Sequence, residues 1–231
     1  MSTEGSCCND FPYTALGNSI AFGIGASDHY GYVYYLRDFL TTPHCCVSLA
    51  NRAVPGFTSS DLLHQLRNDA PTREAVREAK LITISIGGNN FLNCPSAPNP
   101  PACFAEGVAT FVVDWPQILN EIRNCIRARA EILVMTIYNP LRGDDPNFQN
   151  LEFFIQQINK VINNCESRSI YKYLVVDVHA DFLGQFTDGR WKVCTWTHFC
   201  EPTPDPHPTN AGHLEIARLH QLVFIGCREI E

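Results

Sequence analysis

Short apolar runs that alternate with helical segments are the feature that most constrains the fold of this chain. Five runs have the length and composition of buried strands: residues 13–16, 45–49, 81–86, 131–137 and 171–178. Segments with helical spacing of apolar residues lie among them, at residues 32–40, 59–67, 108–128, 148–166 and 210–227. Strands that alternate with helices favour a parallel sheet that is covered on both faces. The pattern therefore predicts an α/β protein: a three-layer α/β/α sandwich around a five-stranded parallel sheet.

Length and composition place the chain among globular proteins. With 231 residues, 45% hydrophobic and 18% charged, it is long enough to bury a sizeable core and too apolar to be disordered. We expect one domain over residues 1–231, of which residues 1–12 form a loose N-terminal segment. The net charge of −7 and the lack of a basic run argue against nucleic acid or an anionic membrane surface as a partner.

The sequence also indicates where the protein works. No apolar stretch approaches the roughly 20 residues that span a bilayer, so we predict no transmembrane segment. The opening sequence, MSTEGSCCNDFPY, lacks the basic and apolar regions of a secretory signal. We therefore predict a cytoplasmic protein, or a secreted one if a signal has been removed.

Eleven cysteines are a high and odd number for one chain. No C-x-x-C spacing occurs, which argues against zinc and thioredoxin-like sites. Cys94 and Cys103 flank a proline-rich loop, and Cys194 and Cys200 flank a later one, so each pair forms a disulfide if the protein meets an oxidising compartment. The thiol count also motivates the hypothesis of a cysteine-based redox protein, which full activity with alkylated thiols would exclude.

Four separated stretches carry the residues from which a site can be built. Ser19 follows the first apolar run in LGNS, Gly56 follows the second in NRAVPGFTSS, and Asn89 follows the third in ISIGGNN. His207 lies in DPHPTNAGH, before the last helical segment. Taken alone, Gly-Asn-Ser is typical of an ordinary turn, because glycine permits a positive φ and Asn and Ser hydrogen-bond their own backbone. Because the carboxyl ends of parallel strands meet at one edge of a sheet, however, the first three stretches should face one crevice.

Acyl transfer is the chemistry that needs this set of side chains. A serine hydroxyl becomes a good nucleophile when a base takes its proton, and a histidine such as His207 is the base that works best near neutral pH. Asp205 is the candidate carboxylate to orient the imidazole. Candidate donors to the oxyanion are Asn89 Nδ2 and the backbone N–H groups of Gly56 and Ser19. Two aromatic residues directly follow the oxyanion stretches and are candidates for substrate contact, Phe57 and Phe91.

Together the four stretches resemble the motifs of the SGNH/GDSL hydrolases, which centre on Ser, Gly, Asn and His in that order. LGNSIAFGIGAS resembles the first motif with Ser19 as nucleophile, and NRAVPGFTSSDLL the second with Gly56. ISIGGNNFL resembles the third with Asn89, and DPHPTNAGH the last with His207 as base. The resemblance runs from about residue 13 to residue 225. It implies a flavodoxin-like sheet and a serine esterase, lipase or thioesterase that works without a metal or a cofactor.

Three positions depart from the pattern of that family. Asn18 and Asn90 stand where the family usually has aspartate. The acid of the last motif normally lies three residues before the histidine, where this chain has Pro204, and Asp205 is one residue closer. The sequence leaves open whether Asp205, another carboxylate such as Glu201, or a backbone carbonyl orients the histidine.

The resemblance predicts hydrolysis of carboxylic esters with small to medium acyl groups on a lipid, a sugar or an alcohol, through an acyl-enzyme on Ser19. Five aromatic residues before the His207 loop either form a substrate site, as the wall of an acyl pocket or a surface that stacks on a sugar, or pack that segment onto the core: Phe182, Phe186, Trp191, Trp196 and Phe199. The alternative hypothesis, motivated by the three departures, is a catalytically impaired relative that binds a glycan or a partner through the same crevice.

Other histidines and acids stand outside the four motifs. We predict a structural role for His213 at the start of the last helical segment. Asp177 and His179 share a face at the end of the fifth apolar run, and no third ligand lies near them, so we predict no metal site.

Overall fold

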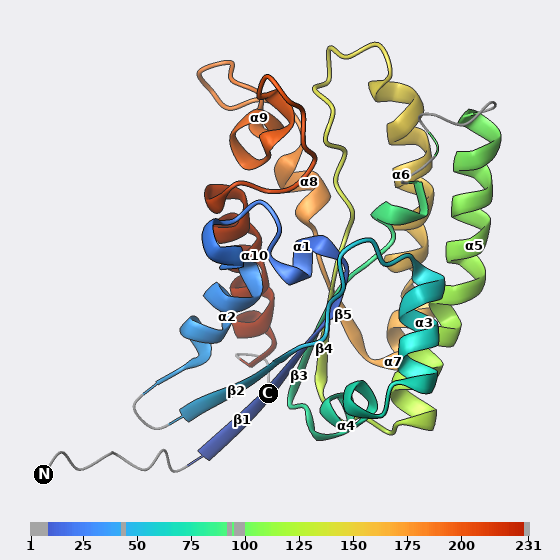
Figure 1. Ribbon diagram of the computed structural model, residues 1–231, viewed down its shortest axis with the longest axis vertical. Helices are drawn as coiled ribbons and strands as arrows, with labels where there is room; N and C mark the ends of the chain where they lie inside the picture. Colours follow the sequence, from blue (N-terminus) through green and yellow to red (C-terminus); the bar gives the residue numbers. More distant parts are fainter. Residues whose placement is uncertain (1–8, 43–44, 92–93, 95–99, 229–231) are drawn as a thin grey trace, which may run out of the picture.

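The computed structural model describes residues 9–42, 45–91, 94 and 100–228, and it contains a five-stranded sheet with helices on both faces (Figure 1). The strands are β1 (Asn9–Gly17), β2 (Cys45–Asn51), β3 (Leu81–Ser85), β4 (Glu131–Met135) and β5 (Tyr173–Val176). Their order is β2-β1-β3-β4-β5, and every neighbouring pair is parallel. This is the flavodoxin-like order, and the predicted three-layer α/β/α sandwich is confirmed.

The helices form two layers around the sheet. One face is covered by α1 (Ser19–Phe22), α2 (Tyr32–Leu40), α8 (Val178–Phe182) and α10 (Asn210–Arg228). The other face is covered by α3 (Ser59–Asn68), α4 (Ala70–Glu78), α5 (Pro100–Asn120), α6 (Phe148–Ile162) and α7 (Cys165–Tyr171). Shorter segments are η1 (Ser27–His29), η2 (Gly88–Phe91), the π-helical turn η4 (Glu121–Cys125), α9 (Lys192–Trp196) and η5 (His198–Cys200).

The core consists of two apolar clusters, one on each face of the sheet. Along β1, Tyr13 and Ala15 point into the cluster under α2 and α10, whereas Leu16 belongs to the cluster under α3, α5 and α6. Because successive side chains of a strand face opposite sides, strands that are covered on both faces are apolar throughout. This explains why the central strands β3 and β4 could be found as continuous apolar runs.

Some predicted boundaries are wrong. β1 begins at Asn9, so residues 9–12 are strand rather than loose chain, and residues 1–8 lie outside the described residues. The helix predicted from residue 108 begins at Pro100, because Phe104 and Gly107 also pack inward. The predicted segment 148–166 is two helices, since Asn164 caps a new one by accepting a hydrogen bond from Ser167 N at 2.8 Å.

Both proposed disulfide pairings are present. Cys94–Cys103 ties residue 94 to the first turns of α5, and Cys194–Cys200 closes the segment between α9 and η5. None of the helices in the described part of the chain combines the length and the apolar character needed to cross a membrane.

Candidate active site

The Ser19 turn depends on a close approach between β1 and β3. Gly17 has φ +135°, and a β-carbon there would lie 2.1 Å from the Ser85 carbonyl oxygen, so the position requires glycine. Asn18 N donates to that same oxygen at 3.1 Å. The Asn18 side chain accepts from Ile20 N at 3.1 Å and caps α1, whose first residue is Ser19. The amide oxygen of Asn18 accepts this capping hydrogen bond just like an aspartate oxygen. Asparagine in place of the family's usual aspartate therefore preserves the turn.

His207 lies between Ser19 and Asp205. Its Nε2 is 2.8 Å from Ser19 Oγ, and its Nδ1 is 2.5 Å from Asp205 Oδ1. With Nδ1–H donating to the carboxylate, Nε2 is the acceptor for the serine hydroxyl. Glu201 is placed elsewhere, since its Oε1 lies 2.5 Å from His198 Nδ1. Of the groups left open by the sequence, the structure places Asp205 beside the imidazole.

The short spacing from Asp205 to His207 works through a local turn. Asp205 Oδ1 accepts from the backbone N of His207 at 2.9 Å as well as from its ring. An aspartate that bonds the backbone two residues on is an Asx turn, which here brings the acid back over the ring. Burial acts to raise the pKa of Asp205, but the hydrogen bonds and charge of His207 outweigh it and hold that pKa below its ordinary value.

A neighbouring segment holds the His207 loop in place. Thr197 forms a β-bridge with Pro208, and His198 N donates to the His207 carbonyl at 3.1 Å. His198 Nε2 lies 3.0 Å from the Gly25 carbonyl, which joins this segment to the loop after Ser19. A β-carbon on Gly25 would lie 2.2 Å from the Pro208 carbonyl, so the loops that carry the nucleophile and the base are in close contact.

The candidate oxyanion loops are joined by side-chain amides. Asn89 Nδ2 donates to the Phe57 carbonyl at 3.0 Å, which ties η2 to the Gly56 loop. Asn90 Oδ1 accepts from Ser59 N at 3.1 Å, and Asn90 Nδ2 donates to Ser59 Oγ at 2.8 Å. The Ser59 hydroxyl in turn donates to the buried Asp114 carboxylate at 2.8 Å. Asn90 thus both accepts and donates, and Asp114 brings a carboxylate to the network although position 90 has none.

A cavity of about 600 Å³ opens beside Ser19, and its size is typical of a small-molecule site. Ser19, Asn89 and His207 line it together with mainly apolar side chains: Phe91, Phe104, Ile137, Tyr138, Leu141, Leu151, Ile155 and Phe199. Phe91 thus lines the cavity, and its contact with a substrate stays a prediction. Gly56 and Phe57 are not among the lining residues: Gly56 is exposed, and Phe57 packs against the core beside a separate polar hollow.

The aromatic segment before His207 mostly serves packing. Phe199 lines the cavity, whereas Trp196 contacts the rings of Phe182 and Phe186 at centroid distances of 6.2 and 5.5 Å. Trp191 packs closely against Gly143, where a β-carbon would lie 2.8 Å from its ring. The packing hypothesis therefore describes four of these five residues.

Tyr138 and His213 support the site from outside the four motifs. Tyr138 lines the cavity, and its hydroxyl donates to the Pro206 carbonyl at 2.6 Å, directly before His207. Tyr138 was not among the residues predicted from the sequence, where its only signal is its place just past the end of β4. His213 accepts from Tyr32 N at 3.2 Å and donates to the Ile24 carbonyl at 2.9 Å, and burial lowers its pKa to about 4. These contacts fit the structural role predicted for His213.

Asp177 and His179 are not among the residues that line the cavity. Asp177 caps α8 by accepting from Ala180 N at 3.2 Å, and His179 is buried beside Glu152 of α6 at 2.8 Å. Among the residues that the structure describes, no three His, Cys, Asp or Glu side chains gather as a metal site would need.

This chain is similar to proteins that are named as lipases and esterases. The model of the GDSL-like lipase/acylhydrolase family matches residues 15–214. The spore germination lipase LipC of Bacillus licheniformis is 28% identical over 182 residues, covering 75% of this chain and 82% of LipC. The lipase Lip_vut3 from a goat rumen metagenome has a TM-score of 0.70 at 24% identity, covering 92% of this chain and 97% of that one. Axe2, an acetylxylan esterase from Geobacillus stearothermophilus, has a TM-score of 0.63 at 18% identity, covering 91% and 92%. The two solved structures share the fold of this chain.

Proposed function

The chain belongs to the GDSL-like lipase/acylhydrolase family, and from that membership we propose that it is a serine esterase of carboxylic esters. The observation that carries the proposal is the line of hydrogen bonds from Ser19 Oγ through His207 to Asp205, with distances of 2.8 and 2.5 Å. Ser19 and His207 also line a largely apolar cavity, in which the acyl group of an ester would lie.

In the proposed reaction, Ser19 Oγ attacks the ester carbonyl carbon while His207 Nε2 takes the hydroxyl proton. The bond between the carbonyl carbon and the alcohol oxygen then breaks, and the imidazolium returns its proton to that oxygen. A water molecule attacks the resulting acyl-enzyme in the same way, which releases the carboxylic acid and restores the Ser19 hydroxyl. Asp205 stabilises the imidazolium that forms in both steps.

The negative charge on the tetrahedral oxygen requires fixed donors. We assign Asn89 Nδ2, together with the backbone N–H groups of Ser19 and Gly56, to this role. Asn89 donates one of its two amide hydrogens to the Phe57 carbonyl at 3.0 Å, which orients the amide and leaves the other hydrogen available. An oriented donor needs little reorganisation as charge develops, which is why such donors lower the barrier.

The cavity favours small to medium acyl groups, because about 600 Å³ is lined mainly by apolar side chains. The relatives and structural neighbours include proteins named as lipases and as an acetylxylan esterase, so lipid, sugar and simple alcohol esters all belong in the substrate screen.

Fluorophosphonate labelling with peptide mapping tests the proposal without knowledge of the substrate, because these probes react with a serine that a base has activated. We expect an adduct on Ser19 in the wild type and a loss of labelling in Ser19→Ala and His207→Ala. His64→Ala is the matched control, since His64 is an exposed histidine of α3.

The same proteins are then assayed on p-nitrophenyl esters from acetate to decanoate. Hydrolysis that depends on Ser19 and His207 supports the proposal. A folded wild type that neither labels nor hydrolyses any ester of the series would refute it, and ligand binding unchanged in Ser19→Ala would favour a binding module.

A further inference from the structure

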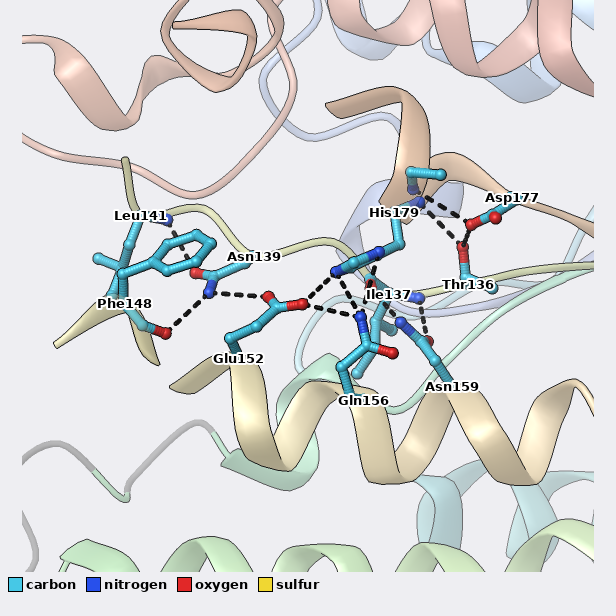
Figure 2. Close-up of polar contacts among 11 residues, drawn as sticks. Thr136, Ile137, Asn139, Leu141, Phe148, Glu152, Gln156, Asn159, Asp177 and His179 are labelled. Carbon is cyan, nitrogen blue, oxygen red and sulfur yellow. Dashed lines mark hydrogen bonds and ion pairs between the residues drawn. The ribbon is translucent and has the colours of Figure 1, made fainter. Parts of the chain in front are cut away.

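One wall of the cavity is a buried segment without helix or strand. Residues 136–141, called the strap here, follow β4 and lie between α6 and α8 (Figure 2). Ile137, Tyr138 and Leu141 of the strap line the cavity. Thr136 is 1% exposed and Asn139 is 5% exposed, so the polar groups of the strap need partners within the protein.

Side chains of α6 supply much of that bonding. Asn159 Oδ1 accepts from Ile137 N at 2.9 Å, and Asn159 Nδ2 donates to the Ile137 carbonyl at 2.9 Å. One buried amide therefore replaces a neighbouring strand at this position of the strap.

Asn139 fixes the next part of the strap in a similar way. Its Oδ1 accepts from Leu141 N at 3.0 Å, and its Nδ2 donates to the Phe148 carbonyl at 3.3 Å and to Glu152 Oε2 at 3.1 Å. The orientation of Asn139, and with it the position of Leu141 in the cavity wall, thus depends on the first turns of α6.

Glu152 connects this group to α8. Its Oε1 accepts from His179 Nε2 at 2.8 Å and from Gln156 Nε2 at 2.8 Å. The backbone N of His179 donates to Thr136 Oγ1 at 2.9 Å, at the start of the strap (Figure 2). The side chains of Glu152 and His179 are only 15% and 9% exposed, so the carboxylate relies on these donors rather than on water.

We propose that Glu152 and His179 are positioning residues that hold the strap through Asn139 and thereby set which acyl lengths the cavity accepts. Neither residue lines the cavity, so any effect on a substrate passes through the strap. This inference rests on the proposed ester hydrolysis. Without the carboxylate, one amide hydrogen of Asn139 and the Nε2–H of His179 lose their acceptor. The strap can then shift, and Leu141 no longer holds one fixed position in the cavity wall.

The test compares Glu152→Ala, Glu152→Gln and His179→Gln with wild type on p-nitrophenyl acetate, butyrate, octanoate and decanoate. The ratio of kcat/KM between the best and the worst ester should fall about tenfold in Glu152→Ala, since a pocket discriminates roughly 10- to 200-fold per methylene only while its walls are fixed. The smaller ratio in Glu152→Ala should arise mainly from changes in KM rather than in kcat. Glu152→Gln should restore part of the ratio, because its amide oxygen still accepts from Asn139. Glu78→Ala, at an exposed glutamate of α4, is the matched control.

Hydrogen exchange of the 136–141 peptide gives a readout independent of turnover, and it should speed up in Glu152→Ala. A folded Glu152→Ala or His179→Gln protein with an unchanged ester ratio would overturn the inference. A loss by the same factor for every ester would also overturn it, because that is the result of a purely structural role. If wild type labels on Ser19 but Glu152→Ala keeps the wild-type ratio, only this inference fails; if wild type neither labels nor turns over, the proposed function itself fails.

Discussion

Replacing His220 by phenylalanine should make the free energy of unfolding decrease less as the pH falls from 7 to 5. His220 lies on α10 with 0% exposure, and its ring stacks on Tyr32 with centroids 4.9 Å apart. Nδ1 bonds the Ile216 carbonyl at 2.8 Å, while Nε2 is buried with no hydrogen-bond partner among the described residues. Protonation would therefore place a charge and an unpaired donor in the core, and burial lowers the pKa of His220 to about 4. Phenylalanine keeps the ring contact but does not titrate.

The pH dependence of stability follows from the difference between the pKa of His220 in the folded protein and its pKa in the unfolded chain. The folded protein holds His220 neutral down to a pKa of about 4, whereas in the unfolded chain it takes up a proton at its ordinary value of 6.5. Between these pH values the unfolded state binds more protons, so the free energy of unfolding decreases as the pH falls. Going from pH 7 to pH 5, this single group should cost the wild type about 2 kcal/mol, and His220→Phe should be spared that loss.

Urea unfolding followed by tryptophan fluorescence at pH 7, 6 and 5 measures this difference, without reductant so that the disulfides stay closed. The decrease in the free energy of unfolding from pH 7 to pH 5 should be about 2 kcal/mol smaller in His220→Phe than in wild type. His64→Ala, at an exposed histidine, should behave as wild type. Equal decreases in wild type and His220→Phe would refute the argument that burial keeps this imidazole neutral.

Three further predictions test the site and its supports. Asn89→Ala should lower kcat about 10²- to 10³-fold on p-nitrophenyl acetate, because one oxyanion donor is lost, and an unchanged kcat would remove Asn89 from that role. Tyr138→Phe deletes the 2.6 Å bond to the Pro206 carbonyl. Since a hydrogen bond of this kind contributes about 0.5–1.5 kcal/mol, kcat/KM should fall by up to about tenfold while the cavity keeps its shape, and wild-type kinetics would contradict this. The double variant Cys194→Ser, Cys200→Ser should lose about 2 kcal/mol of the free energy of unfolding, as expected for opening a short loop, and the reasoning fails if urea melts show equal stability.

The central strands of the sheet were predictable because they are buried on both faces. Leu81 and Ile82 point to opposite clusters and both are 0% exposed, so the whole strand appears as one apolar run. The helix α4 was not predicted, although Asp69 caps it by accepting from Thr72 N at 2.9 Å and Pro71 stands in its first turn. It is short and contains one large apolar side chain, Val76, so it offers too few apolar positions for a helical period to be recognised.

Ser19 and His207 were predictable from their chemistry and from the order of the four motifs, since the turn around Ser19 is ordinary when taken alone. The role of Asp205 was left open because it depends on local geometry: this side chain bonds the backbone N–H of His207 as well as its ring. The Asn139–Glu152–His179 group was missed because its members come from three separate elements, the strap, α6 and α8. No local pattern marks contacts that exist only after the layers have packed.

The hydrogen bond between Ser19 and His207 joins residues that are 188 positions apart. During synthesis the serine is made early, whereas the histidine follows only after all five strands, and the helix that anchors its loop comes last. A chain that stops before His207 therefore carries the hydroxyl without its base. Under the proposed mechanism, ester cleavage begins only after the His207 loop has been made and has folded onto the Ser19 turn, so shorter nascent chains are inert.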